Sequence, residues 1–213
     1  MRKTFLAITL FLAFSKAALA QFGNCTASEM RTYVDSATGN TITMLTDTMK
    51  NDRFLYQTDP MWTADGKYLL FRSSSRGNDK EVESTLPNGE NRKWTPTQIY
   101  FIEMATGKII QATEGPNLGS AFLANKTNRM FVSRKEKENW NMYVMDLNKF
   151  FADVKQGKVG KPSAYETFIG TFPTEMGRPG GYAVDCNDDY AYITVEREGT
   201  EEEKERMMKN AFL

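Results

Sequence analysis

Short stretches of alternating apolar and polar residues cover most of the chain after residue 30, and Gly, Asn and Asp residues separate them. Residues 62–71 place an Asp65-Gly66 turn between two apolar runs, which is a typical β-hairpin signal. The same shape recurs at residues 122–131 and 184–193, with polar turns at 125–128 and 187–189. The copies begin at Trp62, Phe122 and Val184, which are 60 and 62 positions apart. The pattern therefore predicts an internally repeated β protein.

A second type of hairpin accompanies this repeat. Residues 98–103 and 108–113 alternate like two strands on either side of an Ala-Thr-Gly turn. Residues 33–46 show the same strand, turn and strand. Residues 141–147 match the first strand of this hairpin. Four-stranded antiparallel units that recur along a chain are typical of β-propeller blades. We therefore predict an all-β fold, an incomplete β-propeller with about three blades of four-stranded antiparallel sheet.

The repeat is longer than an ordinary blade of about 40–45 residues. Two polar insertions, residues 74–96 and 149–173, hold the surplus and are predicted to be loops, either decoration or part of a binding face. Residues 199–213 are acidic first and basic later, which favours a helix. A propeller needs about four blades to close. Three explanations fit a chain with too few blades: it is truncated, it assembles with other copies, or the repeat is a different one. We expect truncation.

The N-terminus has the order of a secretory signal peptide. Arg2 and Lys3 precede an apolar stretch, and Ala18-Leu19-Ala20 fits a cleavage site. The stretch is too short to span a bilayer comfortably, which argues against an uncleaved anchor. We expect residues 1–20 to be a signal peptide and residues 21–213 to be one partial propeller domain that lacks its C-terminal part. The mature protein is expected to be periplasmic or secreted and free of the membrane.

Composition narrows the function further. The 213 residues include 27 Lys and Arg, 27 Asp and Glu, and no histidine. A net charge of zero argues against nucleic-acid binding. Without histidine the chain holds no Ser-His-Asp or Cys-His site and no histidine-ligated metal. Export permits a disulfide between Cys25 and Cys186, and two free thiols fit the sequence equally well.

Candidate binding residues precede and follow the first repeat copy. Arg53 could pair with a carboxylate, Tyr56 could stack on a sugar ring and Gln57 could bond hydroxyl groups. The alternative is that Phe54 and Tyr56 pack between blades while Arg53 is solvated.

Two further arginines, Arg72 and Arg76, follow the strand of that copy and suit an anionic ligand. Pairing with acidic residues of the blades is the alternative for both. Asp185 to Glu196 has the acidic spacing of a calcium loop, but Tyr190 occupies the glycine position, so a hairpin turn is the better interpretation.

Several of these segments resemble the start of oligogalacturonate lyases, which are seven-bladed β-propellers close in sequence to TolB-like propellers. The resemblance covers residues 31–198 and rests on residues 33–39, 44–46, 54–57, 63–66, 69–71 and 109–115. It implies β-elimination of pectic oligosaccharides in pectin catabolism, with manganese on the uronate carboxylate and a base, typically histidine, on the C5 proton.

The resemblance also sets limits on this chain. The family's metal-binding histidines and base belong to later blades, and Asn51 or Asp52 stands where an earlier histidine is usual. No catalytic residue or metal ligand is carried over. Arg53, Tyr56, Gln57 and Arg72 remain as substrate-binding candidates for a pectic oligosaccharide. We expect an inactive N-terminal fragment of such a lyase; the alternative is a periplasmic TolB-like propeller that binds a protein or sugar without chemistry.

Overall fold

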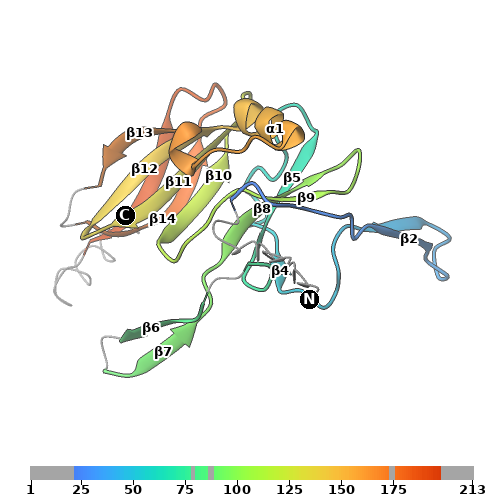
Figure 1. Ribbon diagram of the computed structural model, residues 1–213, viewed down its shortest axis with the longest axis horizontal. Coiled ribbons are helices and arrows are strands. Elements are labelled where there is room, and N and C mark those ends of the chain that lie inside the picture. Colours follow the sequence, from blue (N-terminus) through green and yellow to red (C-terminus); the bar gives the residue numbers. More distant parts are fainter. Residues whose placement is uncertain (1–21, 78–79, 86–88, 173–175, 198–213) are drawn as a thin grey trace, which may run out of the picture.

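The computed structural model describes residues 22–77, 80–85, 89–172 and 176–197 (Figure 1). Strands dominate this part of the chain, and they form a five-stranded sheet, a four-stranded sheet and three separate hairpins. The predicted all-β class is therefore confirmed. Within the described part, no helix has the length and apolar character needed to cross a membrane. The expected signal peptide at residues 1–20 and the expected helix at 199–213 lie outside the described residues.

The first sheet contains the first predicted hairpin and its companion. Its strand order is β1 (Cys25–Thr26), β9 (Ile109–Gln111), β8 (Gln98–Glu103), β5 (Tyr68–Ser73) and β4 (Asp52–Arg53), and every pairing is antiparallel. The β8–β9 hairpin lies where the alternation at residues 98–113 predicts it. Strand β1 at the outer edge was not predicted from the sequence, because a strand of two residues is too short to show an alternating pattern.

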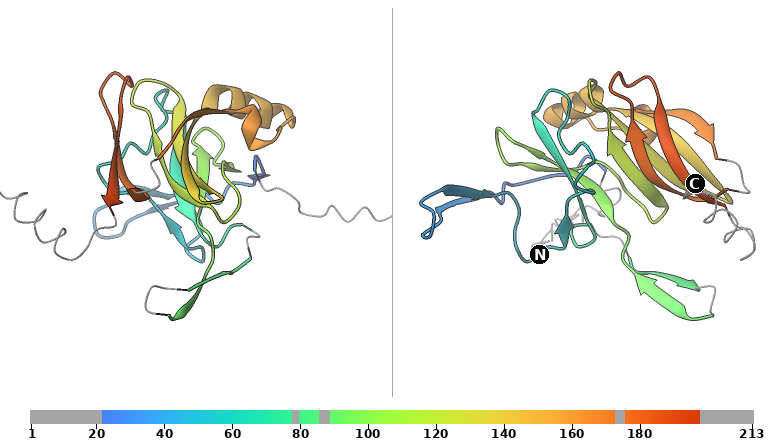
Figure 2. Two further views of the ribbon diagram at one scale, coloured as in Figure 1. Left: turned by 90° about the vertical axis from the view of Figure 1, so that its left-hand side faces the viewer. Right: turned by 180° about the vertical axis from the view of Figure 1, so that it is seen from behind.

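The second and third repeat copies form the second sheet and a further hairpin. The second sheet has the order β10 (Leu118–Leu123), β11 (Arg129–Glu136), β12 (Asn139–Asp146) and β13 (Glu166–Thr171). The third copy is the hairpin of β14 (Met176–Val184) and β15 (Ala191–Arg197), which we call the third hairpin. Figure 2 shows the first sheet, the second sheet and the third hairpin side by side.

Backbone hydrogen bonds fix the period of the repeat. The N–H groups of Thr63, Ala124 and Asp185 each donate, over 3.0 Å, to the carbonyl five residues later. Equivalent positions are thus 61 residues apart in both steps. Trp62 corresponds to Leu123, and the predicted start of the second copy at Phe122 is wrong by one residue. Both residues are apolar, so the pattern could not choose between them, although a shift of one reverses the face of every side chain.

The first polar insertion was predicted as a loop, and this prediction is wrong, because the insertion contains a β-hairpin. Strands β6 (Val82–Thr85) and β7 (Asn91–Trp94) pair with each other and project from the first sheet (Figure 1). The remaining hairpin, β2 (Arg31–Val34) with β3 (Thr41–Met44), projects from another side of the molecule.

The second insertion was predicted as a loop, and this prediction is wrong. It contains α1 (Leu147–Gln156), the short 3-10 helix η1 (Pro162–Ala164) and strand β13. The Asp146 carboxylate accepts the Lys149 N–H over 3.0 Å and caps the start of α1, and Gly157 ends the helix with a φ of 65°. Phe150 and Phe151 are buried, so what the sequence offers as an exposed loop is part of the core.

The core lies between neighbouring units. Side chains of the first and second sheets form its largest part, which includes Leu70, Phe101, Ile110, Leu123, Met130 and Val132. Phe151 of α1 stacks on Tyr68 with ring centroids 3.6 Å apart and joins the helix to this layer. The opposite face of the second sheet packs Phe122 and Phe131 against the third hairpin. Each face of the second sheet is therefore buried against a neighbour.

Candidate functional site

A hollow of about 880 Å³ opens where the first sheet, the second sheet and the third hairpin meet. Its volume lies within the usual range of small-ligand sites, about 300–1,000 Å³. We call it the central hollow. Its wall consists of residues from the loop before β5, β5, β8, β10, β14 and β15, namely Leu55, Tyr56, Gln57, Thr58, Asp59, Arg72, Ile99, Leu118, Gly119, Ser120, Ala121, Phe122, Gly180, Gly181, Tyr182, Ala183, Tyr192, Ile193 and Thr194.

The structure brings three of the four predicted binding residues together in this wall. Tyr56, Gln57 and Arg72 line the central hollow, although Arg72 is 15 residues or more from the other two in sequence. Arg53 is not part of the lining, but it is the direct cross-strand partner of Arg72 between β4 and β5. Directly opposed residues of antiparallel strands share one face of the sheet. The four candidates thus form one neighbourhood.

Positive charge is poorly compensated on this face. None of the ion pairs formed within the described residues includes Arg53 or Arg72. The Arg53 side chain donates from Nε to Asn51 Oδ1 over 3.2 Å, which leaves its charge unpaired there. Like charges directly opposite each other across a sheet repel. An anion between the two guanidinium groups would remove this repulsion. The lining itself contributes one carboxylate, that of Asp59.

Aromatic side chains flank the central hollow. Tyr56 is 69% exposed and Tyr192 is 60% exposed, so both rings are open to a ligand. Phe54 is also exposed, so the two rings do not pack between blades as the alternative predicts, while Arg53 is exposed as that alternative expects. Exposed tyrosine rings combine an apolar face with a hydroxyl group, which suits contact with sugars.

The part of the wall formed by β10 and β14 is held in place by contacts with the buried residues Phe122 and Ser133. The ring of Tyr182 stacks on Phe122 with centroids 4.6 Å apart, and its hydroxyl lies 2.8 Å from Ser133 Oγ. Ser133 Oγ also accepts the Ser120 N–H over 3.0 Å. A Cβ added to Gly119 would lie 2.4 Å from Ser133 Oγ, so this position has no room for a side chain. The wall is therefore preorganised.

The third hairpin's contribution to the site was missed in the sequence. Tyr182 and Tyr192 are more than 100 residues from Arg72, and local patterns do not join them. The corrected period of 61 residues provides the missing signal, because it makes Thr194 the equivalent of Arg72. Both residues line the central hollow.

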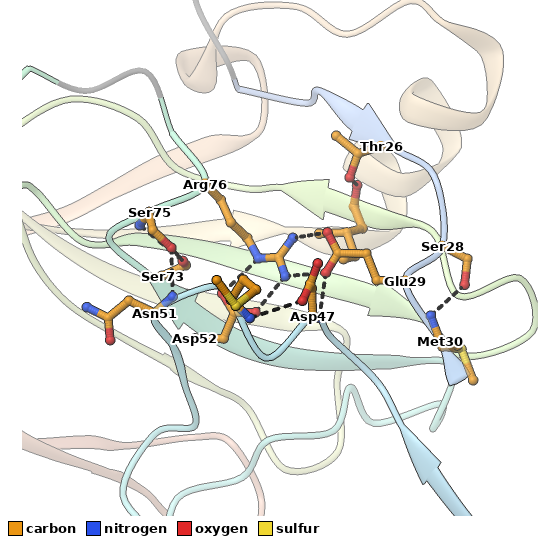
Figure 3. A network of polar contacts seen from close by, with 12 residues as sticks. Thr26, Ser28, Glu29, Met30, Asp47, Asn51, Asp52, Ser73, Ser75 and Arg76 are labelled. Carbon is orange, nitrogen blue, oxygen red and sulfur yellow. Dashed lines mark hydrogen bonds and ion pairs between the residues drawn. The ribbon is translucent and has the colours of Figure 1, made fainter. Parts of the chain in front are cut away.

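Arg76 has a different role from Arg72. Its guanidinium group donates to both carboxylate oxygens of Glu29 over 2.8 and 2.6 Å, and to both of Asp52 over 2.8 and 2.6 Å (Figure 3). The side chain is buried and lies 5.3 Å from the centroid of the Phe71 ring. The hydrogen bonds from Arg76 hold the pKa of Glu29 below its ordinary value. The alternative of pairing with acidic residues is therefore confirmed for Arg76, which joins the N-terminal segment and β4 to the end of β5.

The donors of the central hollow do not fit a manganese site. Within the described ranges, no three His, Cys, Asp or Glu side chains come close enough to hold a metal ion together. Manganese favours oxygen ligands such as carboxylates, and the lining offers one carboxylate, that of Asp59. We therefore assign no catalytic step to a metal on this wall.

Two smaller sequence questions are settled by the geometry. Cys25 and Cys186 are both exposed free thiols. The Asp185 carboxylate accepts the N–H groups of Asn187 and Tyr190, over 3.1 and 2.8 Å, and closes the turn between β14 and β15. The interpretation of this segment as a hairpin turn is confirmed.

Comparison with known proteins gives a match in structure and none in sequence. No protein-family model and no curated protein matches the chain. An oligogalacturonate lyase solved in complex with manganese is 20% identical with a TM-score of 0.53, over 79% of this chain and 36% of that one. A second oligogalacturonate lyase, from Vibrio parahaemolyticus, is 21% identical with a TM-score of 0.52, over 78% and 35%.

These matches concern the fold. The predicted resemblance to oligogalacturonate lyases is confirmed in three dimensions. The chain spans 36% of the length of the first of them.

Proposed function

We propose that the protein binds short acidic oligosaccharides of the oligogalacturonate type in its central hollow. The observation that carries this proposal is the position of Arg72, which has no ion-pair partner among the described residues and opens into a hollow flanked by exposed Tyr56 and Tyr192. The likeness in fold to oligogalacturonate lyases supports the same ligand class.

Each side chain has a role in this proposal. The planar guanidinium group of Arg72 forms a bidentate pair with one uronate carboxylate, and Arg53 lies beside it for a neighbouring carboxylate. Tyr56 and Tyr192 stack on sugar rings, and the Gln57 amide bonds ring hydroxyls. A polymer of uronic acids offers this combination of negative charge, apolar ring faces and hydroxyl groups.

The proposed setting is an exported β-propeller lyase of pectic oligogalacturonides. The sheets would be its blades, and the signal-peptide pattern of residues 1–20 supports export. Pairing a uronate carboxylate with Arg72 would ease loss of the adjacent C5 proton, because it stabilises the negative charge that develops there. We propose that manganese ligands and the base lie in parts of the propeller that this chain does not span, so this chain alone binds its ligand without cleaving it.

Replacing Arg72 with glutamine tests the binding role. Loss of a charged hydrogen-bonding partner is worth about 1.5–3 kcal/mol, so we expect trigalacturonate to bind about 10- to 100-fold more weakly. Isothermal titration calorimetry on the purified protein measures this change.

Arg92→Gln is the matched control, since Arg92 is an exposed arginine of β7 away from the central hollow lining. It is expected to bind like the unchanged protein. Equal weakening by Arg72→Gln and Arg92→Gln would contradict the proposal, because it would mean that overall charge and not the site determines affinity.

A further inference from the structure

The two packing interfaces of the molecule can be compared position by position. We call the contact between the first and second sheets the first interface, and the contact between the second sheet and the third hairpin the second interface. The strand pairings of the second sheet and the third hairpin have the same register after 61 residues, which makes Tyr182 the equivalent of Ala121. The same period makes Ser133 the equivalent of Arg72.

In the second interface a tyrosine closes the space between the two neighbours. Ser133 is buried, and its Oγ lies 2.8 Å from the hydroxyl of Tyr182. The Tyr182 ring stacks on Phe122 with centroids 4.6 Å apart. Ring stacking and the hydroxyl contact therefore fill this level of the second interface with protein atoms.

The arginine of the first interface lies on the face where the serine of the second interface lies. Leu70 and Ile99 belong to the core between the first and second sheets. Arg72 is two residues after Leu70 on β5 and directly opposite Ile99 on β8. Alternate residues of a strand share one face, and so do directly opposed residues. Arg72 is therefore on the sheet face that packs against the second sheet.

The first interface has a small residue where the second interface has its tyrosine. Ala121 ends at its Cβ atom, and the side chain of Arg72 is exposed and does not fill the space. The central hollow reaches between the sheets at this level, because Arg72, Ile99 and Ala121 all line it. Ile99 and Ala121 are buried core residues, so this part of the lining combines an apolar floor with an unpaired guanidinium group.

We propose that Ala121 is a specificity-determining residue, which admits the ring of one uronate between the first and second sheets. The ring lies at the level that Tyr182 occupies in the second interface. Its apolar face contacts Ala121 and Ile99, its carboxylate pairs with Arg72, and its hydroxyl groups face the open side of the central hollow. This inference rests on the proposed function and adds where the sugar ring lies.

Ala121→Tyr copies the residue of the second interface into the first and tests this position. The added ring should occupy the space of the sugar and weaken trigalacturonate binding at least about tenfold, because overfilling a packed site is costly. Isothermal titration calorimetry measures the change. Ala121→Val adds two methyl groups only and should weaken binding about fivefold. This smaller variant decides the question if Ala121→Tyr does not fold.

Ala112→Val is the matched control for the valine variant. Ala112 is buried in the same core between the first and second sheets, but it is not part of the lining of the central hollow. The control should bind trigalacturonate like the unchanged protein. Thermal unfolding followed by circular dichroism verifies that the compared variants are folded.

The results distinguish this inference from the proposed function. Unchanged affinity in the folded Ala121 variants, while Arg72→Gln still weakens binding, would overturn this inference alone. Equal weakening by Ala121→Val and Ala112→Val would also overturn it, because the loss would then come from the core and not from the ligand's position. Absence of binding to the unchanged protein would overturn the proposed function, and this inference with it.

Discussion

Replacing Arg76 with methionine is expected to lower the free energy of unfolding by about 3–5 kcal/mol, because removal of one partner of a buried ion pair leaves charge uncompensated. Methionine keeps much of the volume and the contact with Phe71 but removes four hydrogen bonds to Glu29 and Asp52. Urea denaturation followed by circular dichroism measures the loss. Arg72→Met is the control and should change stability by less than about 0.5 kcal/mol, as an exposed arginine without an ion pair.

The same variant has a diagnostic dependence on pH. The pKa of Glu29 is lowered in the folded state, so its contribution to stability is present above its unfolded pKa and is lost as pH falls through the folded pKa. In Arg76→Met the hydrogen bonds that lower the pKa of Glu29 are lost, so this contribution is absent from the variant. The stability difference between the two proteins should therefore shrink below about pH 4. A difference that is constant with pH would assign the loss to packing and not to charge.

Replacing Asp188 with alanine is expected to destabilise the protein by about 2–4 kcal/mol, since hydrogen bonds to a charged group are worth about 1.5–3 kcal/mol each. The buried Asp188 carboxylate accepts the N–H groups of Asn125, Lys126 and Thr127 over 2.6, 2.8 and 2.8 Å, and the Thr127 hydroxyl over 2.9 Å. It holds the third hairpin against the turn of the second sheet. Thermal unfolding followed by circular dichroism measures this effect.

Two controls separate the carboxylate from the backbone at this position. Asp189→Ala changes the adjacent exposed aspartate and should be close to neutral. Asp188→Asn tolerates the φ of 64° at this residue and should recover part of the loss. Equal stability of Asp188→Ala and Asp189→Ala would contradict the proposed role. Because the third hairpin carries Tyr182 and Tyr192, Asp188→Ala should also weaken ligand binding.

Low pH should weaken the contact between Asp188 and residues 125–127, as Asp188→Ala does. Burial by itself raises the pKa of Asp188, but the hydrogen bonds from residues 125–127 outweigh it, and the folded-state pKa is lowered. The stability that Asp188 contributes is therefore present above its unfolded pKa and is lost as pH falls through the lower folded value.

Local turn chemistry explains why most of the fold was predictable. Asp65-Gly66 and Thr106-Gly107 lie between alternating runs, and each forms the turn that the pattern indicates. Helix α1 was not predicted, since its buried face has few apolar residues within a lysine-rich segment. The apolar spacing of Leu147, Phe150 and Phe151 is helical and follows the capping Asp146, so a local signal was present.

The candidate site divides in the same way. Tyr56 and Gln57 could be predicted from the sequence because they lie in one short segment beside the first hairpin. The partners of Arg76 could not be predicted, because Glu29 is 47 residues away and no repeat relates the two. Tyr192 entered the site through the packing of the third hairpin, which a pattern of strands does not describe.

Calorimetric titration of the unchanged protein with trigalacturonate and with its methyl ester tests the central claim most directly, namely that the central hollow recognises a uronate carboxylate through Arg72. The ester keeps the rings and hydroxyl groups but removes the charges. We predict that the acid binds at least about tenfold more tightly than the ester, as loss of a charged hydrogen bond requires, and that added salt weakens the acid alone. Equal affinity for the two sugars, or binding of neither, would contradict the account.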